Sequence, residues 1–121
     1  MHIVELRMNY DRKNFFGVVE QVTEFIDWFR DDEHMKSLVR KGLAFVCKND
    51  ADAGFHITFV DDGKRYCYNI YTTRDDRENG TVSVRTQYEF SYGCDEWVHV
   101  SVATMRKKLY AMCKREERSA A

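Results

Sequence analysis

Residues 55–73 read FHITFVDDGKRYCYNIYTT, which is the clearest strand-turn-strand pattern in the chain. Apolar and polar side chains alternate on both sides of Asp62-Gly63, a dipeptide typical of two-residue hairpin turns. The pairs that such a turn brings together are Phe59–Tyr66, Ile57–Tyr68 and Phe55–Ile70. Because every partner on that face is apolar, the stretch predicts two antiparallel strands with one face in the core.

The next connection carries a second turn signal, Asn79-Gly80. A two-residue turn there would set Ile70 against Glu89, whereas a three-residue loop over 78–80 with Gly80 left-handed in a bulge keeps the face apolar. The expected pairs are Tyr68–Phe90, Ile70–Tyr88 and Thr72–Thr86. We expect the polar half of this hairpin, RDDREN (74–79), to project into solvent.

The flanking segments supply the remaining elements. Alternation over residues 2–9 predicts a strand, and apolar spacing near 3.6 predicts a helix over 14–30. The stripe of that helix contains Phe15, Val18, Val19, Val22, Phe25, Ile26 and Phe29. A second, short helix is expected to begin at Asp31 or Asp32 and to stop at Gly42. We then expect a strand over 43–48, another over 97–103 and a last helix over 103–117.

These elements define the fold class. The chain has 121 residues, of which 44% are hydrophobic, and this suits one domain with one core. We expect a single α+β domain over 1–121, in the order β-α-α-β-β-β-β-β-α. An antiparallel sheet of about five strands would carry the helices on one face. A helix-grip arrangement, in which the sheet curls around the last helix and leaves a small-molecule pocket, is the topological alternative.

Cysteine, histidine and glycine patterns argue against metal, cofactor and catalysis. The four cysteines, Cys47, Cys67, Cys94 and Cys113, are widely spaced, and the sequence has no CxxC or HxxxH pair. We expect free thiols in the reducing cytoplasm. The sequence also lacks the glycine patterns of phosphate-binding loops and of the hydrolase nucleophile elbow. We therefore expect no enzyme, no cofactor and no metal. No apolar run approaches the roughly 18 residues of a membrane span.

The polar face of the expected sheet is the place where chemistry could occur. The registers above place His56, Asn69, Glu89 and His99 in one row, with Cys67 diagonal to His56. A Cys/His site is therefore the catalytic alternative. The two histidines would lie roughly 14 Å apart, because neighbouring strands are about 4.8 Å apart, and they could not share one metal ion.

Charge is segregated along the chain. Residues 11–35 hold seven acidic and three basic side chains, whereas residues 102–118 hold six basic and two acidic ones. A last helix over 103–117 would carry a basic stripe that could follow nucleic-acid phosphates. Its members are Lys107, Lys108, Lys114, Arg115 and Arg118.

Several side chains suit a protein interface better than a core. Trp28 and Phe16 lie off the expected helix stripe, and Trp97 lies on the polar sheet face. The further candidates are the loop residues Arg74, Asp75, Asp76, Arg77 and Glu78 and the polar-face residues Tyr71 and His99. We therefore expect a non-catalytic module that binds a larger protein partner, as a monomer or homodimer.

Such a module could act as an inhibitor that occludes its partner, in the manner of small phage and plasmid proteins directed at host systems. Nucleic-acid binding through the basic helix is the first alternative, and a helix-grip ligand domain is the second.

Overall fold

The computed structural model describes residues 1–26, 31–49, 53–88 and 95–114. Within them the elements are β1 (His2–Lys13), β2 (Val19–Ile26), α1 (Asp32–Lys48), β3 (Ala53–Asp61), β4 (Lys64–Tyr71), α2 (Arg74–Asn79), β5 (Thr81–Tyr88), β6 (Val98–Ser101) and α3 (Val102–Ala111). The strands form one antiparallel sheet in the order β2-β1-β3-β4-β5-β6. The α+β class is confirmed, with six strands described instead of about five.

The central β3–β4 hairpin has the predicted register, with Phe55 opposite Ile70, Ile57 opposite Tyr68 and Phe59 opposite Tyr66. Asp62 and Gly63 have φ values of 51° and 74°. Two successive residues with positive φ form the turn whose twist matches that of the flanking strands.

The predicted helix over 14–30 is wrong. Residues Val19–Ile26 form β2, which pairs with a β1 that is longer than the predicted strand 2–9 and ends at Lys13. The apolar spacing that imitates a helix comes from valine, phenylalanine and isoleucine, which also favour strands. Gly17, with a φ of 75°, lies in the turn between the two strands. Phe29 lies outside the described residues.

Helix α1 continues through Gly42 and includes residues 43–48, so the predicted helix stop and strand there are both wrong. Its buried side chains recur at helical spacing over Met35, Val39, Leu43 and Val46. Gly42 is needed for packing, because a Cβ atom at this position would overlap the ring of Phe55. The predicted N-cap is confirmed at Asp31, whose side chain accepts a 2.7 Å hydrogen bond from the His34 N–H.

The connection between β4 and β5 differs from the predicted bulged hairpin. Residues 74–79 form the short helix α2, and Gly80 is left-handed as expected, with a φ of 68°. The observed pairs are Tyr66–Tyr88, Tyr68–Thr86 and Ile70–Val84. This register differs from the predicted one by four residues, an even number, so each side chain stays on its expected face.

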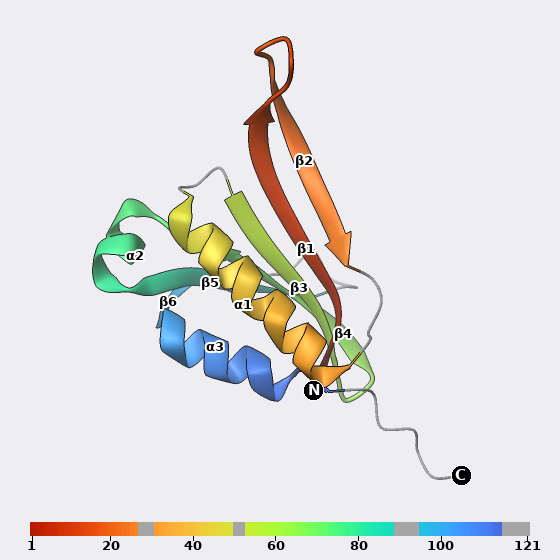
Figure 1. Ribbon diagram of the computed structural model, residues 1–121. Coiled ribbons are helices and arrows are strands. Elements are labelled where there is room, and N and C mark those ends of the chain that lie inside the picture. The colour runs from red at the N-terminus through yellow and green to blue at the C-terminus, as the bar shows by residue number, and fades with distance from the viewer. Residues whose placement is uncertain (27–30, 50–52, 89–94, 115–121) are drawn as a thin grey trace.

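Helices α1 and α3 cover the same face of the sheet (Figure 1). The core lies between these helices and the sheet. Leu6, Phe55, Ile57, Tyr68 and Ile70 fill it together with side chains of α1 and α3. The opposite face, which we call the open face, carries side chains such as Arg7, His56 and Asn69. In the part of the chain that the structure describes, no helix is long and apolar enough to cross a membrane.

Candidate functional site

The β1–β2 hairpin extends beyond the rest of the sheet (Figure 1). The register of β1 with β3 ends at Tyr10 and Ala53, whereas its register with β2 continues to Lys13 and Val19. Four apolar side chains lie at or next to its turn, and we call them the fingertip: Phe15, Phe16, Val18 and Val19.

The turn that carries the fingertip is held by Asn14. Its side-chain oxygen accepts hydrogen bonds from the N–H groups of Phe16 and Val18, at 2.9 and 3.1 Å. Its backbone N–H donates to the Val18 carbonyl at 2.9 Å, and its carbonyl accepts from the Gly17 N–H at 3.0 Å. This turn fixes the backbone from which the two phenylalanine side chains extend.

The fingertip is exposed to solvent, its two phenylalanines most of all. Phe15 is 97% exposed and Phe16 is 83% exposed, and their rings contact each other edge to face with centroids 5.6 Å apart. The charges beside them balance, since Asp11 and Glu20 match Arg12 and Lys13. Arg12 and Glu20 form an ion pair at 3.5 Å. The predicted helix stripe placed Phe15, Val18 and Val19 in the core, and the structure corrects this.

On the open face, three residues predicted as partner contacts come together. Tyr71 ends β4, Trp97 precedes β6 and His99 lies within β6, and all three line a pocket of about 400 Å³. Thr72, Thr73 and Ser83 complete the described lining. The Tyr71 and Trp97 rings meet edge to face at 5.5 Å, and the Arg85 guanidinium lies 4.7 Å from the centroid of the Trp97 ring.

Asp76 lies behind this pocket and is only 1% exposed, so it is not the surface contact that its polar segment predicted. Oxygen Oδ2 of Asp76 accepts hydrogen bonds from the Thr73 N–H, the Thr73 hydroxyl and the Ser83 hydroxyl, at 3.0, 3.1 and 2.6 Å. Oxygen Oδ1 accepts from the Thr81 hydroxyl at 2.7 Å and lies 2.8 Å from His99 Nδ1.

These contacts decide the charge of Asp76. Burial alone would raise the pKa of its carboxyl, but the hydrogen bonds from Ser83, Thr73, Thr81 and His99 outweigh burial and hold the pKa well below its usual range. Asp76 is therefore a buried carboxylate.

Ser83, His99 and Asp76 do not form a nucleophilic triad. The Ser83 oxygen lies 3.2 Å from His99 Nδ1, which is the same nitrogen that faces Asp76. In a working triad the serine faces the other ring nitrogen, so that it can lose its proton to the imidazole. Here the Ser83 hydroxyl donates to Asp76.

A second hydrogen-bonded chain fixes Tyr71. Its hydroxyl lies 3.4 Å from His56 Nε2, and His56 Nδ1 lies 2.7 Å from the Asn69 side-chain oxygen. Burial lowers the pKa of His56, the Asn69 hydrogen bond opposes this, and the nearby Arg7 charge adds to it. Gly54 leaves room for the Tyr71 ring, because a Cβ there would lie 2.7 Å from Tyr71 Cε1.

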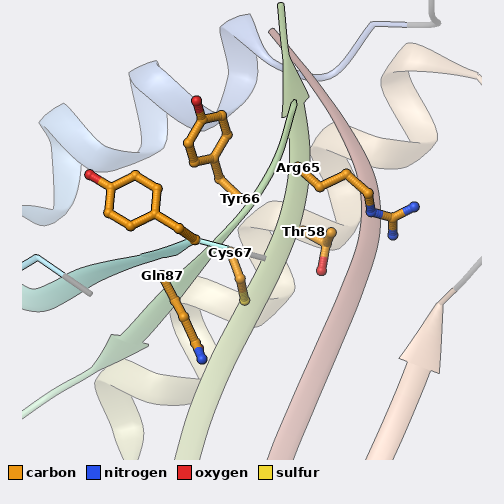
Figure 2. Close-up of a pocket in the computed structure, with 6 residues that line it drawn as sticks. Thr58, Arg65, Tyr66, Cys67 and Gln87 are labelled. Atoms are coloured by element: carbon orange, nitrogen blue, oxygen red, sulfur yellow. The ribbon is translucent and has the colours of Figure 1, made fainter. Parts of the chain in front are cut away.

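The predicted Cys/His alternative lacks an activated nucleophile. Burial raises the pKa of the Cys67 thiol, the Arg7 charge partly opposes this, and the thiol donates to the Tyr68 carbonyl at 3.6 Å. Tyr66 and Cys67 both line a pocket of about 180 Å³. Their side chains leave β4 in opposite directions (Figure 2). The other residues that line the pocket are Thr58, Arg65, Gln87 and Tyr88.

The predicted polar row is partly confirmed. His56 lies opposite Asn69, but the partner of Asn69 on β5 is Arg85, and His99 lies opposite Ser83. Glu89 lies outside the described residues.

The remaining predicted contacts lie on α2, on or just after α3, and outside the described residues. Arg74, Asp75, Arg77 and Glu78 are exposed on α2, where Arg74 and Glu78 approach to 3.7 Å. Lys107 and Lys108 are exposed on α3, which ends at Ala111 and not at the predicted 117, so Lys114 lies beyond the helix. The expected stripe along one helix face is therefore wrong for Lys114. Trp28, Arg115 and Arg118 lie outside the described residues.

Within residues 1–26, 31–49, 53–88 and 95–114, no three histidine, cysteine, aspartate or glutamate side chains group as metal ligands. The thiols of Cys47, Cys67 and Cys113 are free. Comparisons of the chain with protein-family models, with curated proteins and with solved structures give no match.

Proposed function

We propose that this protein is a non-catalytic module that binds a larger protein by inserting its fingertip into an apolar pocket of that partner. One observation carries the proposal: Phe15 and Phe16 are 97% and 83% exposed at the end of a hairpin that extends beyond the sheet. Large apolar side chains gathered on a monomer surface are typical of interaction sites.

The fingertip can contribute substantial binding free energy. Burying one large apolar side chain is worth about 1.5 to 3 kcal/mol, so two phenylalanines could supply about 3 to 6 kcal/mol before the costs of association. The Asn14 hydrogen bonds lower one of these costs, because the turn backbone is ordered before binding. Interface hot spots have this character, with aromatic anchors that fill a pocket of the partner.

The surroundings of the fingertip favour a protein over a lipid surface or a nucleic acid. Basic clusters bind anionic headgroups and phosphates, but Asp11 and Glu20 cancel the charges of Arg12 and Lys13 here. A partner with an apolar pocket and a mixed-charge rim complements this composition. Occlusion of a functional site on that partner is the mode of action that we propose, as an inhibitor would show.

The free thiols support a cytoplasmic location for the protein. Cys47, Cys67 and Cys113 are unpaired, as is usual where glutathione keeps thiols reduced. We propose that the protein acts in the cytoplasm, as a monomer or homodimer.

Affinity capture from a cell lysate, divided into nuclease-treated and untreated halves, tests this function. The wild-type chain is compared with Phe15→Ser/Phe16→Ser, which removes both rings from solvent-exposed positions and should leave the fold unchanged. The matched control is Val98→Ser, which removes an exposed apolar side chain from β6 at the other edge of the sheet.

We expect one stoichiometric protein with the wild type and with V98S, and at least a tenfold loss with F15S/F16S. Equal capture by F15S/F16S would overturn the proposal. Partners that disappear on nuclease treatment would favour nucleic-acid binding instead.

A further inference from the structure

Helices α1 and α3 carry an excess of positive charge. Residues 32–48 and 102–114 together hold eight basic side chains and two acidic ones, a net charge of +6. The whole chain has a net charge of −1, so its other residues together carry −7. Because both helices lie on the same face of the sheet (Figure 1), the positive charge is concentrated on one side of the protein.

The two helices lie side by side and run in roughly opposite directions. Burial raises the pKa of the Cys47 thiol near the end of α1, and the charge of Arg106, in the first half of α3, partly opposes this. Burial also raises the pKa of the Cys113 thiol, just after α3, to about 11, and the charge of Lys36 near the start of α1 partly opposes it. Each end of α3 therefore lies near the opposite end of α1, so cations of both helices share one surface.

Six cations of these two helices are exposed, and we call them the basic surface: Arg40, Lys41, Lys48, Arg106, Lys107 and Lys108. Within the described residues, none of the six forms an ion pair with a carboxylate. Lys36, which is half-buried, pairs instead with Glu33 at 3.4 Å. The two acidic residues of α1 are confined to its first turn. The charge of the basic surface is therefore available to a partner.

The other exposed residues of these helices narrow the choice of partner. They are small, as at Ala44, Ala103, Thr104 and Ala111, and the large hydrophobic side chains that the structure shows as exposed all lie outside α1 and α3. Protein interfaces are enriched in aromatic anchors and depleted in lysine, and membrane-surface helices insert apolar side chains. Single-stranded nucleic acids are bound through aromatic side chains on which their bases stack. The phosphates of a duplex require only cations.

We propose that the basic surface binds the phosphate backbone of a double-stranded nucleic acid without reading its sequence. Helix α1 has 17 residues and is therefore about 25 Å long. A DNA duplex carries one charge per about 1.7 Å, so a segment of that length presents about 15 phosphates, enough to contact all six cations. The negative charge of the remaining residues repels phosphates, which directs a duplex to this side of the protein.

Fluorescence anisotropy of a labelled 20-base-pair DNA duplex, titrated with the full chain, tests this proposal. If six phosphates are neutralised, we expect the affinity to fall about a thousandfold between 50 and 200 mM salt. A duplex of unrelated sequence should bind equally well. Lys41→Gln/Lys107→Gln removes one cation from each helix, so it should weaken binding at least tenfold and reduce the salt slope by about two.

The matched control is Lys13→Gln/Lys64→Gln, which changes the net charge equally at exposed positions outside the two helices. We expect it to change the affinity less than twofold. Equal effects of the two double variants, or an affinity that does not depend on salt, would overturn the proposal. No binding of the duplex at 50 mM salt would also overturn it, and binding of phosphatidylserine vesicles under those conditions would assign the surface to a membrane instead.

An RNA duplex of the same sequence, titrated beside the DNA duplex, distinguishes the two sources of the phosphates. Tighter binding of either duplex identifies that nucleic acid as the partner of the basic surface. F15S/F16S should bind the duplex like the wild type, because the fingertip lies outside the basic surface. This result separates the inference from the function proposed for the fingertip.

Discussion

Nitrogen Nδ1 of His99 lies 2.8 Å from Oδ1 of Asp76, which joins the edge strand β6 to a carboxylate that is 1% exposed in α2. The same carboxylate accepts hydrogen bonds from Thr81 and Ser83 of β5. One buried charge therefore connects α2, β5 and β6. The segment that the sequence predicts as a solvent-projecting hairpin tip is in fact anchored to the sheet.

Replacing Asp76 should destabilise the fold more than replacing its neighbour. Asp76→Asn turns an acceptor-only group into one that also presents an N–H₂, against hydroxyls that now donate to it. We expect the free energy of unfolding to fall by about 3 kcal/mol, as for a broken buried polar network. Urea denaturation measures the change. Asp75→Asn, at an exposed position on the same helix, should cost less than about 0.5 kcal/mol. Equal effects of the two variants would refute the anchoring role.

The Asp76 carboxyl also predicts how stability depends on acid. Its pKa is depressed in the folded protein, so the unfolded chain binds the proton more readily. The contribution of Asp76 is complete above the ordinary aspartate pKa of about 3.9, and it is lost as the pH falls from there toward the lower folded value. The difference in unfolding free energy between wild type and D76N should therefore shrink between pH 6 and pH values below about 3. A difference that stays constant over this range would contradict the assignment.

Gly42 provides a test of the α1 packing. Glycine to alanine inside a helix ordinarily stabilises by about 1 kcal/mol. Gly42→Ala should instead destabilise by about 1 to 3 kcal/mol, because the added methyl group overlaps the Phe55 ring. Thermal and urea unfolding give the sign directly. Phe55→Leu should relieve the overlap, so the two substitutions should be non-additive in a double-mutant cycle. Strictly additive effects would show that Gly42 does not touch Phe55.

The sequence predicts the centre of this fold better than its edges. At Asp62-Gly63, turn chemistry and side-chain alternation agree, and the register there is confirmed. At 14–30 they conflict, because valines and phenylalanines of an outer hairpin happen to fall at helical spacing. The local signal for the turn is Asn14 followed by Gly17, but the helical periodicity of the apolar residues around it points to a helix. Edge strands lack the two-sided pairing that would otherwise constrain such a segment.

The candidate sites show the same division. Trp97, Tyr71 and His99 could be selected from the sequence, because a strand pattern places them on the polar face. The sequence does not predict that these three residues converge, because their convergence requires residues 74–79 to fold into α2. In the sequence Asp76 is one of several charges expected to be exposed, whereas the capping box with Thr73 turns it inward. The helical spacing places Phe15 on the core stripe and Phe16 off it, so the sequence predicts the exposure of Phe16 but not that of Phe15.

Site-specific photo-crosslinking in cells that make the protein tests most directly whether the fingertip contacts a protein partner. A benzophenone amino acid replaces Phe16 in one variant, Val98 in a second and Lys107 in a third. We expect a single protein adduct from position 16, its loss when Phe15 is changed to serine in the same chain, and none from position 98. An adduct from position 98 alone, nucleic acid crosslinked at position 107 alone, or no adduct from position 16 would contradict the proposed role of the fingertip.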